Sequence, residues 1–267
     1  MIAFMRDLLV RFRDLHASGC FVIPNPWDIG SAKLLAQLGF PALATTSSGF
    51  AWSRGRQDND VALDDVLAHL RAVSAAVDVP INADFEGGFA VEPNDVAKNV
   101  AAASATGIAG LSIEDSTGDA AHPLFDFGLA VDRIRAARAA TDLVLVARCE
   151  AYLVGRPDLD EVRRRLTAYA EAGADCLYAP GVRSLAEIRA IVEAVAPKPV
   201  NVLVGSGFTT LAELRDLGVR RISVGGALAR AAWSGFLAAA EEIATHGTFT
   251  ALGDAIPYAN INGRFGR

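Results

Sequence analysis

The feature that most constrains the fold is a repeated alternation of short apolar runs with helix-like segments. Eight apolar runs recur along the chain, at 21–23, 42–46, 80–84, 110–114, 143–148, 175–179, 200–204 and 221–225. Four times a helical stretch ends at a glycine and the next apolar run follows at once, as in LGFPAL, TGIAGL, AGADCL and LGVRRI. Strands that alternate regularly with helices form parallel sheets, because each helix carries the chain back to the same edge.

Helix-like segments separate these runs, at 31–38, 63–77, 93–106, 129–140, 160–172, 184–195 and 210–217, and one more, 227–245, follows the last run. Together with an amphipathic N-terminal helix, this pattern predicts a (β/α)₈ barrel of the TIM type in a single domain, 1–267. The alternative is an open doubly wound sheet, which usually has fewer strands and a Gly-rich phosphate loop after the first strand. Here the first run leads to Asn25-Pro26-Trp27-Asp28, without a GxGxxG motif.

Composition excludes several classes of protein. The chain is 52% hydrophobic and 21% charged, which provides a large core and argues against disorder. A net charge of −6 argues against nucleic acid or an anionic membrane as a partner. The charged N-terminus is not a signal peptide, and no apolar run reaches the roughly 18 residues of a membrane span. The three cysteines form no CxxC pair, so we expect reduced thiols in a cytoplasmic protein.

Carboxylates follow directly on several apolar runs. They are Asp84 and Glu86 after the third run, Glu114 and Asp115 after the fourth, Glu150 after the fifth, and Asp58 in a loop beyond the second. Since the carboxyl ends of parallel strands share one face of a barrel, these acids are expected to cluster there. Clustered carboxylates repel one another unless a cation or shared protons hold them together. Mg²⁺ is favoured, because it needs few direct carboxylates and completes its octahedron with water.

The order of residues at each strand end indicates separate roles. Asp84 and Glu86 are two positions apart and so point to the same side, which suits metal binding better than a capping or turn role. Of the next pair, Glu114 is expected to point inward while Asp115 caps the following loop. Arg148 shares a face with Glu150 and fits a two-pronged clamp for a carboxylate or phosphonate. Its alternative is a structural salt bridge with Glu150 or Glu114.

Two further groups of residues were weighed. The second run ends in Thr45-Thr-Ser-Ser-Gly49, whose hydroxyl and N–H groups suit an anionic group, although an ordinary Ser-rich turn is the alternative. The four histidines have no metal-ligand spacing, and His16, His69 and His246 are expected on helices in surface positions. That scatter argues against a zinc site or a Ser-His-Asp site.

Eight ordered segments together resemble the isocitrate lyase / phosphoenolpyruvate mutase superfamily: NPWDIGSAKLLAQLGF, TTSSGFAWSRGRQD, NADFEGGF, GLSIEDS, ARCEAYL, GADCLYAPG, PVNVL and RISVGGALARAA. The resemblance implies an α/β barrel that exchanges C-terminal helices between subunits and assembles as a homodimer or homotetramer. It also implies Mg²⁺, with Mn²⁺ as an alternative, holding a small α-oxo carboxylate while an enolate is stabilised.

The resemblance also implies residue roles. Asp84 looks like the direct metal ligand, and Glu86, Glu114 and Asp58 look like acids that hold metal-bound waters. Arg148 is similar to the substrate clamp of the family, and we count Arg148 and Asp58 as catalytic candidates. The substrate cradle would be formed by Ser47, Ser48 and Gly49, with Asn201 near the pocket.

The chain departs from the family in the segment after the fourth strand. The lyase branch has a Lys-(Lys/Arg)-Cys-Gly-His loop there, whereas residues 116–126 contain neither Cys nor Lys. The mutase branch usually has Glu-Asp-Lys, and here Ser116 replaces the Lys. Both departures argue against true isocitrate lyase or mutase activity. His122 is the one titratable group of this loop that could act as a lid acid, the alternative being a plain loop histidine.

These observations predict a Mg²⁺-dependent enzyme that breaks or forms a C–C or P–C bond beside the oxo group of a small α-oxo acid. The substrate would be oxaloacetate-like or phosphonopyruvate-like. The alternative is a non-catalytic relative that binds metal and oxo acid but has lost the lid chemistry.

Overall fold

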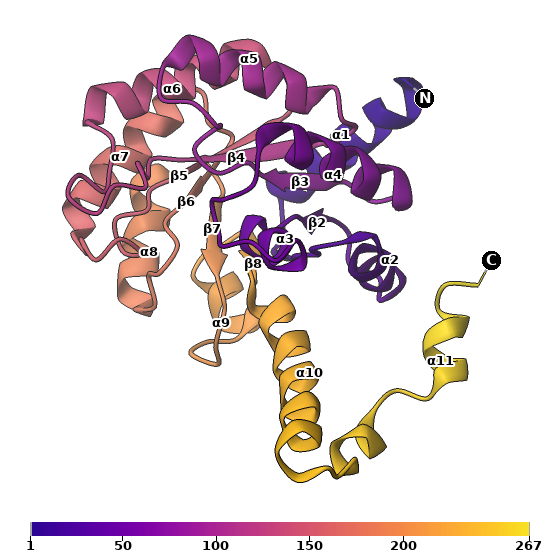
Figure 1. The fold of residues 1–267 in the computed structure, drawn as a ribbon. Coiled ribbons are helices and arrows are strands. Elements are labelled where there is room, and N and C mark those ends of the chain that lie inside the picture. Colours follow the sequence, from indigo (N-terminus) through magenta and orange to yellow (C-terminus); the bar gives the residue numbers. More distant parts are fainter. Residues whose placement is uncertain (1, 267) are drawn as a thin grey trace.

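In the computed structural model, which describes residues 2–266, eight parallel strands form one sheet that curves into a nearly closed barrel (Figure 1). The strands are β1 (Phe21–Ile23), β2 (Leu43–Ala44), β3 (Ile81–Asp84), β4 (Gly110–Glu114), β5 (Val144–Arg148), β6 (Cys176–Tyr178), β7 (Val200–Leu203) and β8 (Arg221–Ser223). Their order is β1-β8-β7-β6-β5-β4-β3-β2. The predicted eight-stranded barrel with an N-terminal helix is therefore confirmed, and the doubly wound sheet is not formed.

The barrel is incomplete between β1 and β2, which form no ladder with each other. The two neighbours are joined by one backbone hydrogen bond, from Ala44 N to Pro24 O at 3.1 Å. Pro24 follows β1 directly and has no N–H group to continue the pairing. This local chemistry explains why β1 and β2 share no ladder; the two residues of β2 pair with β3, although the apolar run there spans 42–46.

Helices surround the barrel and extend beyond it. They are α1 (Ile2–Ala17), α2 (Ile29–Gln37), α3 (Ser47–Ser53), α4 (Leu63–Ala76), α5 (Pro93–Ser104), α6 (Phe127–Ala140), α7 (Leu159–Glu171), α8 (Leu185–Val195), α9 (Leu211–Asp216), α10 (Ala227–His246) and α11 (Tyr258–Gly263), with a 3₁₀ turn η1 (Thr250–Asp254). The predicted helices lie within two residues of these bounds, whereas α3, η1 and α11 were not expected. Across residues 2–266, no helix combines the length and the apolar character that a membrane crossing requires.

Side chains of α1 enter the N-terminal end of the barrel. Phe12 is fully buried in a cluster with the inward-facing residues Phe21, Ile23 and Val146. Gly110 makes room for this ring, because a Cβ at that position would lie 2.6 Å from Phe12 Cε1. The apolar packing fills this end of the barrel, so that polar groups are left to gather at the other end.

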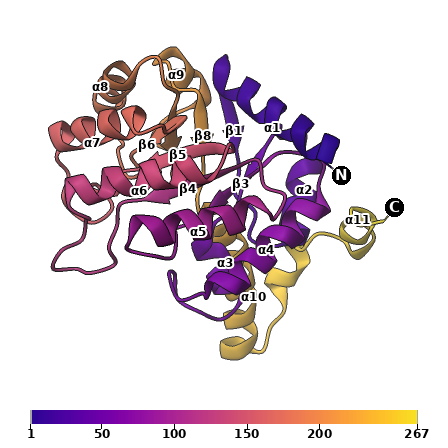
Figure 2. The ribbon, with the colours of Figure 1, turned by 90° about the horizontal axis from the view of Figure 1, so that it is seen from above.

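The C-terminal segment forms an arm rather than a closing layer of the barrel. In Figure 1, α10 runs away from the strands, and η1 and α11 turn the chain back; Figure 2 shows α11 beyond α2 and α4. Of the twenty residues of α10, Ala229 is the one that is buried. Large exposed apolar side chains follow the arm: Trp233, Phe236, Leu237, Ile243, Phe249, Leu252, Ile256 and Tyr258.

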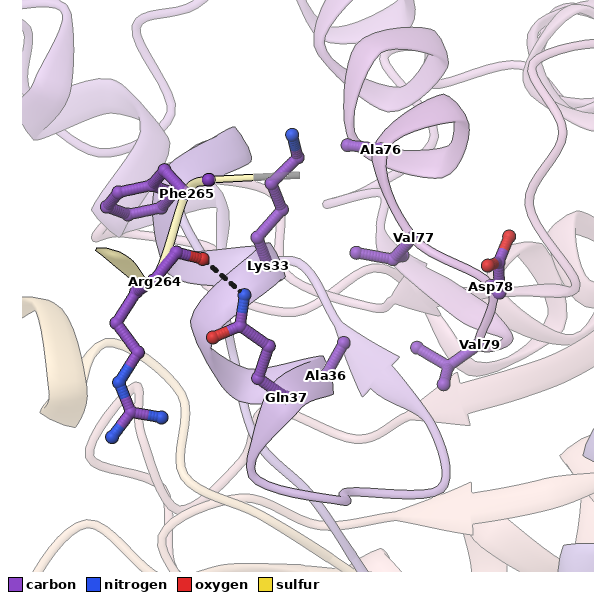
Figure 3. Close-up of a pocket in the computed structure, with 10 residues that line it drawn as sticks. Lys33, Ala36, Gln37, Ala76, Val77, Asp78, Val79, Arg264 and Phe265 are labelled. Atoms are coloured by element: carbon purple, nitrogen blue, oxygen red, sulfur yellow. Dashed lines mark hydrogen bonds between the residues drawn. The ribbon is translucent and has the colours of Figure 1, made fainter. Parts of the chain in front are cut away.

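The end of the arm returns to the same chain at α2. Figure 3 shows Arg264 and Phe265 beside this helix, where Gln37 Nε2 donates a hydrogen bond to Arg264 O at 2.6 Å. A hollow of about 430 Å³ lies between them and residues 76–79. Because those residues directly precede β3, the hollow lies near the beginnings of the strands and not near their carboxyl ends.

Candidate active site

A cavity of about 180 Å³ opens at the carboxyl ends of the strands. Residues from within or just after all eight strands contribute to its lining. Five residues predicted from the sequence are among them: Ser47, Ser48, Asp58, Asp84 and Arg148. The strand-end argument and this cavity therefore point to the same face of the barrel.

Arg148 is the centre of an ion cluster at this end of the barrel. Its Nη1 lies 2.6 Å from Asp84 Oδ1, its Nη2 lies 3.1 Å from Glu114 Oε2, and its Nε lies 2.9 Å from Glu150 Oε1. Burial acts to lower the pKa of Arg148, but Glu150, Glu114 and Asp84 outweigh it and raise that pKa well above its usual value. The salt bridges weighed as an alternative for Arg148 are thus present.

The other oxygen of Asp84 is held by the first turn of α3. Ser47 donates to Asp84 Oδ2 from its backbone N at 3.0 Å and from its Oγ at 2.9 Å. The backbone N–H of Asp84 donates to Thr45 Oγ1 at 2.9 Å. The expected Ser-rich loop is a short helix because Thr46 caps it, accepting a hydrogen bond from Gly49 N.

The structure separates Ser48 from Gly49. Ser48 lines the cavity, and its Oγ lies 3.1 Å from Thr46 Oγ1. Gly49 is buried and does not line the cavity. A Cβ on Gly49 would lie 2.7 Å from Thr46 Cγ2 and 3.0 Å from Trp27 Cβ, so packing against neighbouring side chains accounts for the glycine.

Three of the predicted acids, Glu86, Glu114 and Asp58, have a raised pKa, and burial is the largest cause in each. Burial, then Asp84 and Asp58, raises the pKa of Glu86 to about 8. Burial, partly opposed by Arg148, raises the pKa of Glu114 to about 8. Burial followed by the charge of Asp84 also raises the pKa of Asp58, although much of that residue remains exposed. The predicted cluster of acids is therefore present.

Glu86 lies on a backbone loop with an unusual conformation. Its φ is 47°, and Gly88 and Phe89 follow with φ of 74° and 55°. Arg133 of α6 holds this loop, since its Nη1 donates to Ala90 O at 2.5 Å and to Val91 O at 2.6 Å, and its Nη2 donates to the carbonyl of residue 87. A buried arginine thus stabilises the strained turn that positions Glu86.

Asp115 has a structural role that the sequence did not indicate. Its Oδ1 accepts from Glu150 N at 2.8 Å, while its Oδ2 accepts from Tyr169 OH at 2.7 Å and from Arg165 Nη1 at 3.2 Å. The expected cap on the following loop is therefore wrong, because these donors attract the carboxylate toward β5 and α7. Glu114, which was expected to point inward, has its Oε2 3.1 Å from Arg148 Nη2.

Besides Gly49, Glu86 and Glu114, two more predicted site residues are absent from the cavity lining. The side chain of His122 is 86% exposed, and its Nδ1 lies 3.4 Å from Asp119 Oδ2. Asn201 is buried on β7, where its Nδ2 donates to Ser223 Oγ at 2.9 Å. Neither residue touches the cavity directly, so their functional roles stay predictions.

The histidine analysis is partly wrong. His16 and His69 lie on helices as expected, but His16 is buried between Phe12 and Phe21, and His69 stacks on Phe50 with 3.9 Å between ring centroids. His16 follows Phe12 by one helical turn, so both rings share the inward face of α1. His246 is exposed on α10, as predicted.

Sequence reasoning missed several polar residues of the cavity lining, among them Asn82, Tyr178 and Arg221. Asn82 precedes Asp84 by two residues and therefore shares its inward face, a signal that was available. Arg221 begins β8 directly after Arg220, and the sequence does not reveal which of these two adjacent charges points into the barrel.

The donor set fits a hard cation that keeps much of its water. Oxygen ligands are what Mg²⁺ prefers, and Asp84, Glu86, Glu114 and Asp58 provide carboxylate oxygens at this end of the barrel. Within residues 2–266, no three His, Cys, Asp or Glu side chains already surround one point. This spacing of the side chains fits an ion that binds few carboxylates directly and takes its other ligands from water.

Comparisons with known proteins agree with this geometry. A family model described as phosphoenolpyruvate phosphomutase matches residues 12–244. A solved protein of Burkholderia cenocepacia J2315, with only the general description lyase/mutase, has a TM-score of 0.95 and 47% identity over 99% of this chain and 98% of its own. A phosphonopyruvate hydrolase solved with oxalate and Mg²⁺ has a TM-score of 0.83 and 27% identity, over 96% of this chain and 94% of the hydrolase.

Among curated sequences, the 2-methylisocitrate lyase of Escherichia coli K12 is 35% identical over 166 residues, which are 58% of this chain and 55% of the lyase. The chain spans less than two thirds of the length of the first curated relatives that it matches.

Proposed function

Since the chain belongs to the phosphoenolpyruvate mutase/isocitrate lyase superfamily, we propose that it is a Mg²⁺-dependent lyase or hydrolase of small α-oxo acids. It would break or form a C–C or P–C bond beside the oxo group of an oxaloacetate-like or phosphonopyruvate-like substrate. The observation that carries the proposal is the cluster of Asp84, Glu86 and Glu114 around Arg148 at the carboxyl end of the barrel.

The chain's own side chains would divide the work. Asp84 would hold the ion directly, while Glu86, Glu114 and Asp58 would accept hydrogen bonds from its water ligands. Bound Mg²⁺ would supply a Lewis acid that stabilises the negative charge of the enolate. The position of Ser47 supports this role for Asp84, because its two hydrogen bonds orient that carboxylate.

Arg148 would orient the substrate beside this ion. Its planar guanidinium presents several N–H donors in a fixed geometry, which suits a carboxylate or phosphonate. Its neighbours Glu114 and Glu150 fix its position through Nη2 and Nε. Ser48 lies in the cavity lining beside the first turn of α3 and would contact the same anionic group.

The arm supports the proposal that subunits exchange C-terminal helices. Isolated apolar residues are normal on protein surfaces, but a continuous apolar stripe needs a partner. The exposed Trp233, Phe236 and Leu237 lie within five residues of α10, beyond the reach of the barrel of their own chain. A homodimer or homotetramer would cover this stripe.

The proposed function can be tested with the Asp84→Asn variant, which removes the charge but keeps the shape of the side chain. Calorimetry should show Mg²⁺ binding to the wild-type protein and little or none to the variant. Product release from a panel of oxo acids with Mg²⁺ should likewise be lost. Asp95→Asn, which changes an exposed acid of α5 paired with Lys98, is the matched control.

Unchanged Mg²⁺ affinity in Asp84→Asn would refute the assignment of the ion to this residue. If Mg²⁺ and oxo acids bind to the wild-type protein but no oxo acid is converted, the non-catalytic alternative is correct. The exposed position of His122 favours that alternative, because it leaves the loop after β4 without an acid directed at the cavity.

A further inference from the structure

The cavity does not end at the cluster of acids but continues into the barrel. The inward-facing residues beneath the cluster are small, namely Ala44, Ser112 and Ser223, and all three line the cavity. Large branched side chains usually fill a barrel at this level. Here the small ones leave a path that reaches Asn82 and Arg221, one inward position deeper on β3 and β8.

Arg221 lies at the deepest point of this path, and few protein groups accept hydrogen bonds from its guanidinium. It is 3% exposed. Its Nη1 donates to Asn82 Oδ1 at 3.2 Å, whereas its Nε is buried without a partner. No carboxylate of residues 2–266 lies within ion-pair distance of it. A guanidinium has five N–H donors, so most of the hydrogen-bonding capacity of Arg221 is unused by the protein.

Arg148 and Arg221 differ in their acidic neighbours. Arg148 contacts three carboxylates, and each of its nitrogens has an acidic partner. Both arginines line one cavity, yet the deeper one has no acid beside it. Burying a charge without a partner is costly, and a pair is normally provided by the protein or by a ligand. A second unpartnered atom, Asn201 Oδ1, belongs to the residue paired with Arg221 in the β7–β8 ladder.

We propose that Arg221 and Asn82 form an anion subsite that receives a second negatively charged group of the substrate. This inference rests on the proposed function and assigns the residue that would recognise the remote anionic group of an oxaloacetate-like or phosphonopyruvate-like substrate. The enzyme would prefer oxo acids that carry a carboxylate or phosphonate remote from the oxo carboxylate over oxo acids with an apolar end. Asn82 positions the guanidinium, and the charge of Arg221 recognises the remote group.

The test compares two probes of nearly equal shape, 2-oxobutyrate and oxaloacetate, which differ by a methyl group in place of the remote carboxylate. With Mg²⁺ present, calorimetry gives the Kd of each, or KM where the probe is turned over. The wild-type protein should bind oxaloacetate at least tenfold more tightly. In Arg221→Met this preference should fall to about twofold or less, while the affinity for 2-oxobutyrate stays within about twofold of wild type.

Arg220→Met is the matched control, since this neighbour donates to Gly19 O outside the barrel and should leave the preference unchanged. Arg221→Lys retains a positive charge in the barrel and should keep part of the preference. If Arg221→Met does not fold, the preference of Arg221→Lys for oxaloacetate over 2-oxobutyrate tests the proposal instead. If neither variant folds, the wild-type pair of probes decides, because equal affinities for the two would overturn the subsite.

An unchanged preference in Arg221→Met, or an equal loss for both probes, would assign Arg221 to structure or to buried water. If the proposed function itself is wrong, neither probe should bind to the wild-type protein with Mg²⁺. The two ideas are therefore separated by the affinity for 2-oxobutyrate, which needs the ion cluster but not Arg221.

Discussion

At the scale of single residues, three arginines of this barrel differ in the groups that their guanidinium contacts. Arg148 contacts three carboxylates, Arg133 contacts backbone carbonyl groups, and Arg221 is left with one amide oxygen. Three buried guanidinium groups thus have three distinct functions: ion pairing, loop positioning and, as we propose, ligand recognition. Residue type alone did not separate them. Arg148 was identified because acids follow the neighbouring strands, whereas no such signal accompanies Arg133 or Arg221.

Replacing Arg148 by lysine should weaken oxo-acid binding by on the order of 2–4 kcal/mol, because an ammonium group cannot contact ligand and carboxylates together. The folded state should also lose stability, since up to three carboxylates are left without a full partner. Calorimetry and urea unfolding measure the two effects. Arg163→Lys, at an exposed pair with Asp160, should change neither; wild-type affinity in Arg148→Lys would mean that Arg148 serves structure alone.

His16 predicts a loss of stability in mild acid. Burial, followed by the charge of Arg221, lowers the pKa of His16 from 6.5 to about 3. Because the folded pKa is the lower one, the unfolded chain takes up the proton first as pH falls below 6.5. By linkage, this residue should cost about 2 kcal/mol of folding stability at pH 5 relative to pH 8.

Urea unfolding at both pH values measures this cost. The matched variants are His16→Leu, which should lose that part of the pH dependence, and the exposed His246→Leu, which should keep it. The raised pKa values of Glu86 and Glu114 act in the opposite direction, so the difference between variants is the informative quantity. Identical pH profiles for wild type and His16→Leu would contradict the prediction.

At the scale of elements, the strands and long helices were predictable because each repeats the same apolar run, glycine joint and amphipathic helix. The departures have local causes. Helix α3 is too short and too rich in serine and glycine for a helical pattern, and it forms because Thr46 caps it. The orientation of Asp115 was not predictable, since its donors Arg165 and Tyr169 lie about fifty residues away on α7.

Helix α6 and the loop after β3 are coupled through Arg133. Its guanidinium carbon also lies 4.0 Å from the centre of the Phe125 ring, at the end of the segment 116–126. Arg133→Met should therefore release both the loop that bears Glu86 and this segment. We expect Mg²⁺ affinity to fall about tenfold, as for other groups that support metal ligands indirectly, and proteolysis of 116–126 to accelerate.

Arg135→Met is the control for that experiment, because Arg135 lies on the same helix and pairs with Asp132 in solvent. A structural role limited to α6 would lower the unfolding midpoint without changing the Mg²⁺ affinity of the molecules that remain folded. Calorimetry well below that midpoint distinguishes the two cases, and an unchanged affinity would exclude the coupling.

At the scale of the whole molecule, the barrel and the arm have different surfaces. The barrel buries most of its apolar residues, while the arm exposes a series of large ones from Trp233 to Tyr258. We expect a dimer or tetramer at micromolar concentration by light scattering, and a monomer in the Trp233→Asp, Phe236→Asp double variant. Leu38→Asp, which changes a leucine of the barrel that is more exposed than Trp233 or Phe236, should leave the mass unchanged. A monomeric wild-type protein would refute helix exchange.

The gap between β1 and β2 affects the order in which the chain can fold. Within the barrel, β1 is synthesised first and pairs with β8, which is synthesised after the other seven strands, and one backbone hydrogen bond joins β1 to β2. Contacts between distant parts of a chain form slowly. Pulsed hydrogen exchange during refolding should therefore protect the β3–β6 amides before those of β1, and simultaneous protection would contradict this order. Newly made chains would spend the time of synthesis with β1 unpaired, a period in which chaperones could bind it.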